Sequence, residues 1–323
     1  MCNYFIRALA STASFFMLSS IALADCGKVS ITEMNWTSSQ IITEVAKFIM
    51  EKGYSCKVKK VPSDTNKAMK SLVETGQPDI ITELWINSLP QYDELKKEGK
   101  VKTATEVLSD GGVQGWWIPK YLADRHPELT TIDDIIENPA LVGNTFHNCP
   151  IGWSCRKIND NLIQALGLDE KMKIFNHTSR ETLATSLSKA YADKKPWFGY
   201  YWAPTAALGK YPMVKISIGQ YKSEIHTCNS KGQQCRVPDI SEYPTGQVIT
   251  AVTSEIAQKN PAIFKLMSNL SLTNAQMGDI LAWKEANKAS TEQAADYFIK
   301  KYENIWSKWI NDDASRKLSV RPK

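Results

Sequence analysis

Residues 28–84 read KVSITEMNWTSSQIITEVAKFIMEKGYSCKVKKVPSDTNKAMKSLVETGQPDIITEL, and this stretch decides the fold. Along it, stretches with the apolar pattern of a strand take turns with stretches in which apolar residues recur at helical spacing. Gly53 and Gly76 follow the two helical stretches and mark their ends. The predicted elements are strands over 28–34, 56–61 and 79–84, and helices over 39–52 and 64–74. A β-α-β-α-β order predicts a parallel sheet that is covered by helices.

The rest of the chain repeats this alternation. We predict strands over 141–146, 197–201 and from 248 onward, helices over 132–136, 156–166 and 182–192, an irregular loop over 223–243, and C-terminal helices with the most amphipathic stretch at 295–309. This order predicts an α/β protein with two lobes, each a mostly parallel sheet flanked by helices. Lobe 1 comprises residues 25–113 plus 246–323, and lobe 2 comprises residues 114–245. Two crossings near Val113 and Gly246 would act as hinges, and ligand would bind in the cleft between the lobes.

The N-terminus is typical of an export signal. Arg7 is followed by a largely apolar run from Ala8 to Leu23, which ends in the small-x-small pattern Ala22-Leu23-Ala24. We predict a signal peptide over residues 1–24, cleaved near Ala24/Asp25, and a periplasmic mature protein. An uncleaved anchor or a lipoprotein attached through the cysteine at position 26 are the alternatives.

Six of the seven cysteines remain once the predicted signal is removed. An even number in an exported chain favours disulfides, although six cysteines allow fifteen connectivities. The local spacing favours three pairs, namely Cys149 with Cys155, Cys228 with Cys235, and Cys26 with Cys56. A zinc site is the competing interpretation, but neither close pair has C-x-x-C spacing, and we predict no metal and no cofactor.

The charge of the chain argues against several function classes. The formal net charge is +5, with basic and acidic residues scattered rather than grouped. A surface without a basic stripe does not favour nucleic acid as a partner. The sequence has no G-x-S-x-G elbow and no C-x-x-C motif, so we predict a binding protein rather than a hydrolase or a thiol oxidoreductase.

Four of the ten tryptophans follow predicted strand ends: Trp36, Trp85, Trp153 and Trp202. Loops beyond the carboxyl ends of strands form the ligand crevice of open α/β sheets. Several indole faces around one volume attract a methylated ammonium, which has no N–H to donate. We therefore predict an aromatic cage for such a cation. We assign the other tryptophans to packing.

The segment Cys149-Pro-Ile-Gly-Trp-Ser-Cys155 precedes a predicted helix. Its last backbone N–H groups would lie at a helix N-terminus, which favours a carboxylate. One end of the pocket would therefore bind a cation and the other an anion. A betaine has this arrangement of charges.

These residues resemble the glycine betaine and proline betaine binding proteins of bacterial ABC importers, the ProX/OpuAC-like family. The resemblance covers the whole mature chain and is most specific at C-x-x-G-W-x-C, with support from Trp85 after "PDIITEL" and Trp202 in "FGYYWAP". It implies a type II periplasmic-binding-protein fold and a cage of Trp85, Trp153 and Trp202. It also implies that the backbone of Ser154 and Cys155 binds the carboxylate of the ligand. It also implies a monomer that delivers its ligand to an ABC permease and its ATPase at the inner membrane.

Two positions depart from the family pattern, and Glu83 complicates the choice of ligand. Leu89 stands where many periplasmic members have a histidine, and Ser38 stands where the choline-binding branch has an acid. Glu83 would either reinforce a cation site or face solvent, and Trp36 would form a fourth cage wall. Choline, carnitine, proline betaine and sulfonium compounds are therefore alternative ligands, and a sensor coupled to a chemoreceptor is an alternative role.

Overall fold

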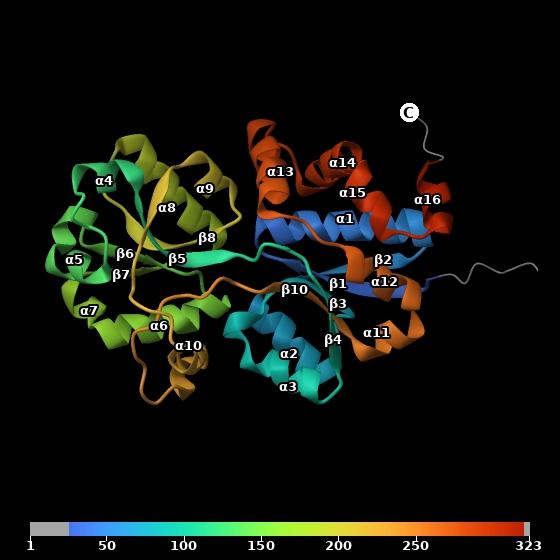
Figure 1. The fold of residues 1–323 in the computed structure, drawn as a ribbon, viewed down its shortest axis with the longest axis horizontal. Helices are drawn as coiled ribbons and strands as arrows, with labels where there is room; N and C mark the ends of the chain where they lie inside the picture. Colours follow the sequence, from blue (N-terminus) through green and yellow to red (C-terminus); the bar gives the residue numbers. More distant parts are fainter. Residues whose placement is uncertain (1–25, 320–323) are drawn as a thin grey trace, which may run out of the picture.

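The computed structural model describes residues 26–319, which form two α/β lobes side by side along the long axis of the molecule (Figure 1). The first sheet has the strand order β2-β1-β3-β10-β4, and the second has the order β7-β6-β8-β5-β9. The first contains β1 (Lys28–Met34), β2 (Lys57–Ser63), β3 (Ile80–Trp85), β4 (Val101–Glu106) and β10 (Val248–Thr253). The second contains β5 (Val113–Pro119), β6 (Thr145–Asn148), β7 (Lys173–Asn176), β8 (Phe198–Ala203) and β9 (Met213–Ile216).

Both sheets are mixed. In the first sheet β1 runs parallel to β2 and β3, whereas β10 runs antiparallel to β3 and β4. In the second sheet β6 runs parallel to β7 and β8, whereas β5 runs antiparallel to β8 and β9. The antiparallel strands are those that follow the two crossings, because each enters its sheet from the other lobe rather than through a crossover helix.

Helices cover both sheets. Those of the first lobe are α1 (Thr37–Tyr54), α2 (Thr65–Thr75), α3 (Pro90–Lys97), α11 (Ser254–Lys259), α12 (Pro261–Asn269), α13 (Asn274–Ala286), α14 (Thr291–Lys301), α15 (Glu303–Trp306) and α16 (Asp312–Ser319). Those of the second lobe are α4 (Lys120–Arg125), α5 (Ile132–Glu137), α6 (Ser154–Leu166), α7 (Leu168–Lys171), α8 (Arg180–Asp193), α9 (Ala206–Lys210) and α10 (Ser223–Ser230). Short 3-10 turns are η1 (Ile86–Ser88), η2 (Pro139–Val142), η3 (Gly232–Gln234) and η4 (Ser307–Trp309).

Three sequence predictions differ from the structure. The strand over 141–146 is wrong at its start, because Pro139 initiates the turn η2 and β6 begins only at Thr145. The loop over 223–243 contains α10 and η3. The stretch 295–309 is not one helix, because α14 ends at Lys301 and α15 follows.

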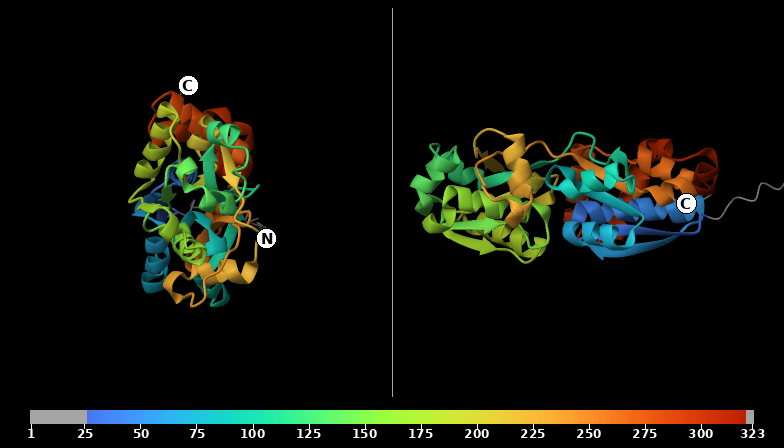
Figure 2. Two further views of the ribbon diagram at one scale, coloured as in Figure 1. Left: turned by 90° about the vertical axis from the view of Figure 1, so that its left-hand side faces the viewer. Right: turned by 90° about the horizontal axis from the view of Figure 1, so that it is seen from below.

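The two lobes are joined by two adjacent segments, which the view from below shows crossing together (Figure 2). The backbones of Gly112 and Gly246 pair there, with N–H to carbonyl distances of 2.9 Å and 2.6 Å. The predicted lobe boundaries fall at this crossing. The residues at which each lobe begins and ends stay a prediction.

Three disulfides join Cys26 to Cys56, Cys149 to Cys155, and Cys228 to Cys235. This is the pairing that the local spacing favours. Because the sulfur of Cys26 is bonded to Cys56, it is not available for attachment of a lipid.

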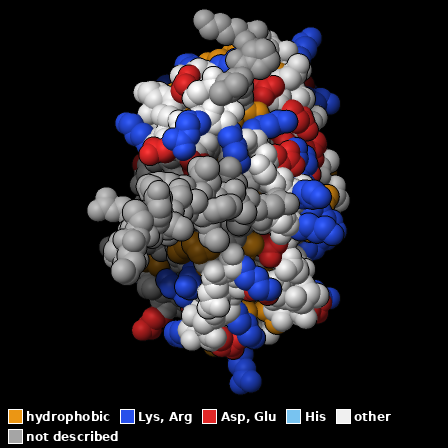
Figure 3. Space-filling view, turned by 90° about the vertical axis from the view of Figure 1, so that its right-hand side faces the viewer, with side chains coloured by type: hydrophobic (Ala, Val, Ile, Leu, Met, Phe, Trp, Pro, Cys, Tyr) orange, Lys and Arg blue, Asp and Glu red, His pale blue; other side chains and the backbone are white. Residues whose placement is uncertain are grey.

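The predicted signal peptide over residues 1–24 lies outside the described residues. Within residues 26–319, no helix has the length and apolarity that crossing a membrane requires. On the part of the surface that Figure 3 describes, Lys and Arg side chains are interspersed with Asp and Glu side chains.

Candidate functional site

A small cavity lies between the two lobes, and all four tryptophans that follow predicted strand ends contribute to its wall. Its lining residues are Trp36, Thr65, Trp85, Gln114, Trp153, Ser154, Cys155, Tyr200 and Trp202. The tryptophans come from both lobes, Trp36 and Trp85 from the first and Trp153 and Trp202 from the second. Each is at most 8% exposed, so the cavity wall consists largely of buried aromatic rings.

Trp153 lies at the centre of this cluster. Its ring meets that of Trp36 edge to face at a centroid distance of 5.4 Å and that of Trp202 at 4.8 Å. Indole faces in such mutually steep orientations present negative π density to one volume from several sides, which attracts a cation. The cavity volume is about 30 Å³, so a trimethylammonium group enters only if the rings or the lobes move apart slightly.

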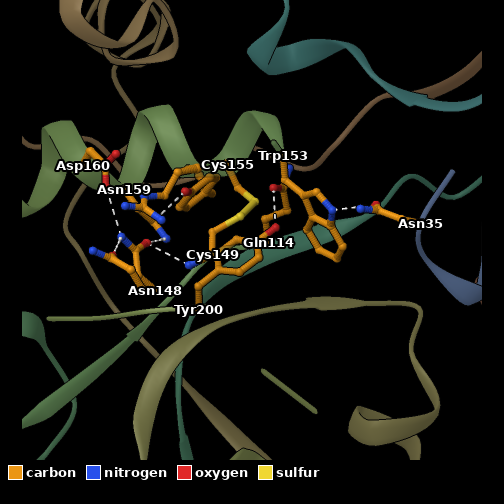
Figure 4. Close-up of a disulfide and its surroundings, with 12 residues drawn as sticks. Asn35, Gln114, Asn148, Cys149, Trp153, Cys155, Asn159, Asp160 and Tyr200 are labelled. Carbon is orange, nitrogen blue, oxygen red and sulfur yellow. Dashed lines mark hydrogen bonds and ion pairs between the residues drawn. A yellow bond between two sulfur atoms is a disulfide. The ribbon is translucent and has the colours of Figure 1, made fainter. Parts of the chain in front are cut away.

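A hydrogen bond from the opposite lobe holds Trp153 in place. Its Nε1 donates to Oδ1 of Asn35 at 2.7 Å, and Asn35 directly follows β1 of the first lobe (Figure 4). Next to it in the sequence, the carbonyl of Gly152 accepts a hydrogen bond from the backbone N–H of Asn66 in the first lobe at 3.4 Å. The cage is therefore complete only when the lobes are in contact.

Trp85 lies against the crossing between the lobes. A Cβ atom added to Gly112 would lie 2.1 Å from the indole ring of Trp85, and one added to Gly246 would lie 2.9 Å from it. Only glycine leaves room for the Trp85 ring at both positions. The two crossing segments therefore fix the orientation of the Trp85 ring.

The other end of the cavity is formed by the start of α6. Ser154 and Cys155 are its first two residues, and no side chain caps this helix. The first N–H groups of a helix lack intrahelical acceptors and lie at the positive end of its dipole. The disulfide from Cys155 to Cys149 ties the first turn of α6 to the end of β6 (Figure 4). This end of the cavity can accept a carboxylate.

Glu83 lies behind the cage rather than in its wall. It is fully buried, and its Oε1 accepts hydrogen bonds from Nε1 of Trp36 at 2.7 Å and from Oγ of Ser38 at 2.8 Å. Oε2 has no partner in hydrogen-bond geometry. Its backbone has a φ of 51°, a strained value for a side chain of this type. Glu83 thus orients one cage tryptophan.

Burial raises the pKa of the Glu83 carboxyl from 4.5 to about 7, although hydrogen bonds from Ser38 and Trp36 lower it. The indole of Trp85 is near enough to lower this pKa further, without forming a hydrogen bond of good geometry. A substantial fraction of Glu83 is therefore protonated near neutral pH. The alternative in which Glu83 faces solvent is wrong, because the apolar rings of the first lobe enclose it.

Four wall or supporting residues were not among the sequence candidates: Asn35, Thr65, Gln114 and Tyr200. Tyr200 stacks on Trp202 at 6.3 Å, and its hydroxyl donates to Oε1 of Gln114 at 2.8 Å (Figure 4). Asn35 directly precedes the candidate Trp36, and Thr65 follows the end of a predicted strand. Their positions in the sequence could therefore have marked both as site residues. Nothing in the sequence marks the pairing of Gln114 with Tyr200.

The departures from the expected pattern have clear places in the fold. Leu89 is 2% exposed and belongs to the core, not to the cavity wall. Ser38 uses its hydroxyl to hold Glu83. Among the described residues, no cluster of three or more His, Cys, Asp or Glu side chains has the arrangement of a metal site.

A cavity enclosed between two α/β lobes that are joined by two crossing segments defines a solute-binding protein. The model of the family described as the substrate binding domain of ABC-type glycine betaine transport systems matches residues 27–301. The chain belongs to this family of substrate-binding proteins.

Two curated relatives have known names. The chain is 23% identical over 247 residues to the glycine betaine-binding periplasmic protein OusX of Dickeya dadantii, covering 70% of this chain and 73% of that one. It is 22% identical over 288 residues to a trimethylamine N-oxide-binding protein of Pelagibacter ubique, covering 84% of this chain and 87% of that one.

Solved structures share the fold. The glycine betaine/L-proline-binding protein ProX of Borrelia burgdorferi superposes with a TM-score of 0.72 at 15% identity, covering 90% of this chain and 99% of that one. Lactococcal OpuAC in complex with glycine betaine superposes with a TM-score of 0.69 at 18% identity, covering 88% and 100%. The type II binding-protein fold that the sequence predicts is confirmed.

Proposed function

We propose that this protein captures a small, fully substituted ammonium compound, with glycine betaine or a similar betaine as the leading ligand. The observation that carries this proposal is the convergence of four tryptophans on one cavity between the lobes, namely Trp36, Trp85, Trp153 and Trp202. Each well-placed ring contributes about 0.5–2 kcal/mol to binding of a cation. The free N–H groups at the start of α6 bind the carboxylate at the other end.

A second ligand class is an amine oxide such as trimethylamine N-oxide. A relative that matches 84% of this chain carries trimethylamine N-oxide in its name. Such a ligand keeps the methylated nitrogen for the tryptophans but has no carboxylate for α6.

As a member of this family, the protein works with an ABC permease and its ATPase. We infer that it acts as a monomer in the periplasm after cleavage near Ala24/Asp25. The closed lobes present the loaded protein to the permease. The cavity is a binding site, and the proposal assigns it no catalytic step.

Titration calorimetry of the mature protein tests the proposal. The ligands are glycine betaine, trimethylamine N-oxide, choline, carnitine, proline betaine and a sulfonium analogue. We expect saturable binding of at least one ligand, in the micromolar range that a few kcal/mol from several rings supports. Absence of binding by all six would contradict the proposal.

The variant Trp153→Ala assigns the binding to the cage. Loss of the central ring removes cation–π and burial contributions, so we expect affinity to fall by about tenfold or more. Trp283→Ala is the matched control, because Trp283 stacks on Tyr297 of α14 and lies outside the cavity wall. Equal affinity of both variants would place the ligand elsewhere.

A further inference from the structure

A second and larger cavity lies between the lobes on the other side of Trp202. Its volume is about 320 Å³, against about 30 Å³ for the cage, and Trp202 is the only residue that lines both. Its walls come from the start of α1 and from α13 in the first lobe, and from α8, β8 and α9 in the second. It is therefore a separate space that both lobes enclose.

Each lobe places one cation in the wall of this cavity. Arg180, the first residue of α8, bonds Glu181 through Nη2 at 2.7 Å, while its Nε is buried without an acceptor. Lys284 on α13 has no carboxylate within ion-pair distance among residues 26–319. The Arg180 side chain is 31% exposed, so its guanidinium group, like the ammonium group of Lys284, can donate a charge-assisted hydrogen bond to an incoming oxyanion.

The remaining charge in the wall is already neutralised. Glu285 of α13 accepts from Nζ of Lys210 of α9 at 2.8 Å, an ion pair that links the two lobes. Glu285 therefore does not compensate Lys284, and Arg180 is paired with Glu181, so Lys284 carries the excess positive charge of the wall. An anion that fills it would meet a cation on each lobe.

The rest of the wall suits an organic molecule. The ring of Tyr201 stacks on Trp202 at 5.1 Å, and Pro204, Ala206 and Leu281 add apolar surface. The hydroxyl groups of Thr37 and Thr185 also lie in this wall. Apolar walls with a few polar groups are typical of small-molecule sites.

We propose that this cavity is a second subsite, which binds a small organic carboxylate between Arg180 and Lys284. It is distinct from the cage and goes beyond the function proposed above. A carboxylate held by both lobes stabilises their closed arrangement. Because linkage is reciprocal, it also raises the affinity of the cage for its own ligand.

Calorimetric titration with succinate tests this subsite, since a dicarboxylate can reach a cation on each wall. We expect saturable binding to the wild type and a loss of about tenfold or more in affinity in Arg180→Gln, and likewise in Lys284→Gln. The control is Lys265→Gln, which removes an exposed lysine of α12 outside the cavity and should leave succinate binding unchanged. No saturable binding, or an equal effect of all three variants, would overturn the proposal.

The Trp153→Ala variant separates this proposal from the cage. It should bind succinate as the wild type does, because Trp153 does not line the second cavity. If succinate binds in this way while no ammonium compound binds, the second subsite stands and the proposed function fails. If succinate affinity falls as far in Trp153→Ala as in Arg180→Gln, the anion lies in the cage and the subsite is refuted.

Discussion

At the scale of single residues, Glu83 determines how the cage is built. Its carboxyl holds the indole N–H of Trp36 and the hydroxyl of Ser38, yet no cation of residues 26–319 pairs with it. Burying an unpaired carboxylate is costly, and its pKa rises in response. A proton, or the cationic head of a ligand nearby, relieves this cost.

Glu83 predicts a pH dependence of stability. Its pKa is about 7 in the folded protein and near its usual 4.5 when unfolded. The folded state therefore holds the proton more tightly, and the free energy of unfolding falls as pH rises from about 4.5 through 7, on the order of 2–4 kcal/mol. Denaturant titrations should show this slope in the wild type and a flatter one in Glu83→Gln. The same slope in both proteins would refute this role.

At the scale of elements, the strand ends position the cage, and this part of the site was predictable. Three of the tryptophans follow apolar runs that the sequence predicts as strands, namely Trp85, Trp153 and Trp202. Trp153 also directly precedes a predicted helix. Trp36 lies in the wall, as its place after β1 suggested. Whether these rings bind the ligand stays a prediction.

Other features were not predictable, because they depend on long-range packing. The bond from Trp153 to Asn35 joins residues 118 positions apart, and the left-handed backbone of Glu83 has no local signal such as glycine. The edge strands β7 and β9 are only four residues long and were missed. Their periodicity is too short to distinguish from a loop.

The hinge segment gives a prediction at this scale. In Gly112→Ala the new methyl group would collide with the ring of Trp85 and displace one cage wall. We expect ligand affinity to fall about tenfold or more, by loss of one ring contact and of closure. The matched control is Gly278→Ala in α13, where no atom lies within 4 Å of the new Cβ. It should keep affinity and gain up to about 1 kcal/mol of stability. Unchanged affinity in Gly112→Ala would contradict this function of the hinge.

At the scale of the whole molecule, the two lobes are in direct contact. Contacts between them include Trp153 with Asn35 and the ion pair of Lys210 with Glu285. Ligand affinity therefore depends on the free energy of lobe closure as well as on the cage. Variants of these contacts would change affinity without touching the ligand.

The second lobe should lose stability in mild acid. His147 Nδ1 lies 3.0 Å from His177 Nε2, and burial lowers the pKa of both rings to about 4. Unfolded histidines take up protons near their usual 6.5, so the free energy of unfolding falls as pH decreases from about 6.5 to 4, on the order of 1–3 kcal/mol. Buried His226 adds to the same effect.

Denaturant titrations of wild type and His177→Gln at pH 7 and 4.5 measure this difference. The variant should lose less stability on acidification than the wild type. An equal loss in the two proteins would contradict the assignment to this pair.

The most direct test of the central claim compares a trimethylammonium ligand with its tert-butyl isostere, in which carbon replaces the quaternary nitrogen. For glycine betaine this isostere is tert-butylacetate, and the two share shape and carboxylate. Calorimetry should show affinity at least about tenfold lower for the isostere, because the tryptophans act on the positive charge. Equal affinities would mean that the site binds shape and apolar surface alone, and the cation cage would be wrong.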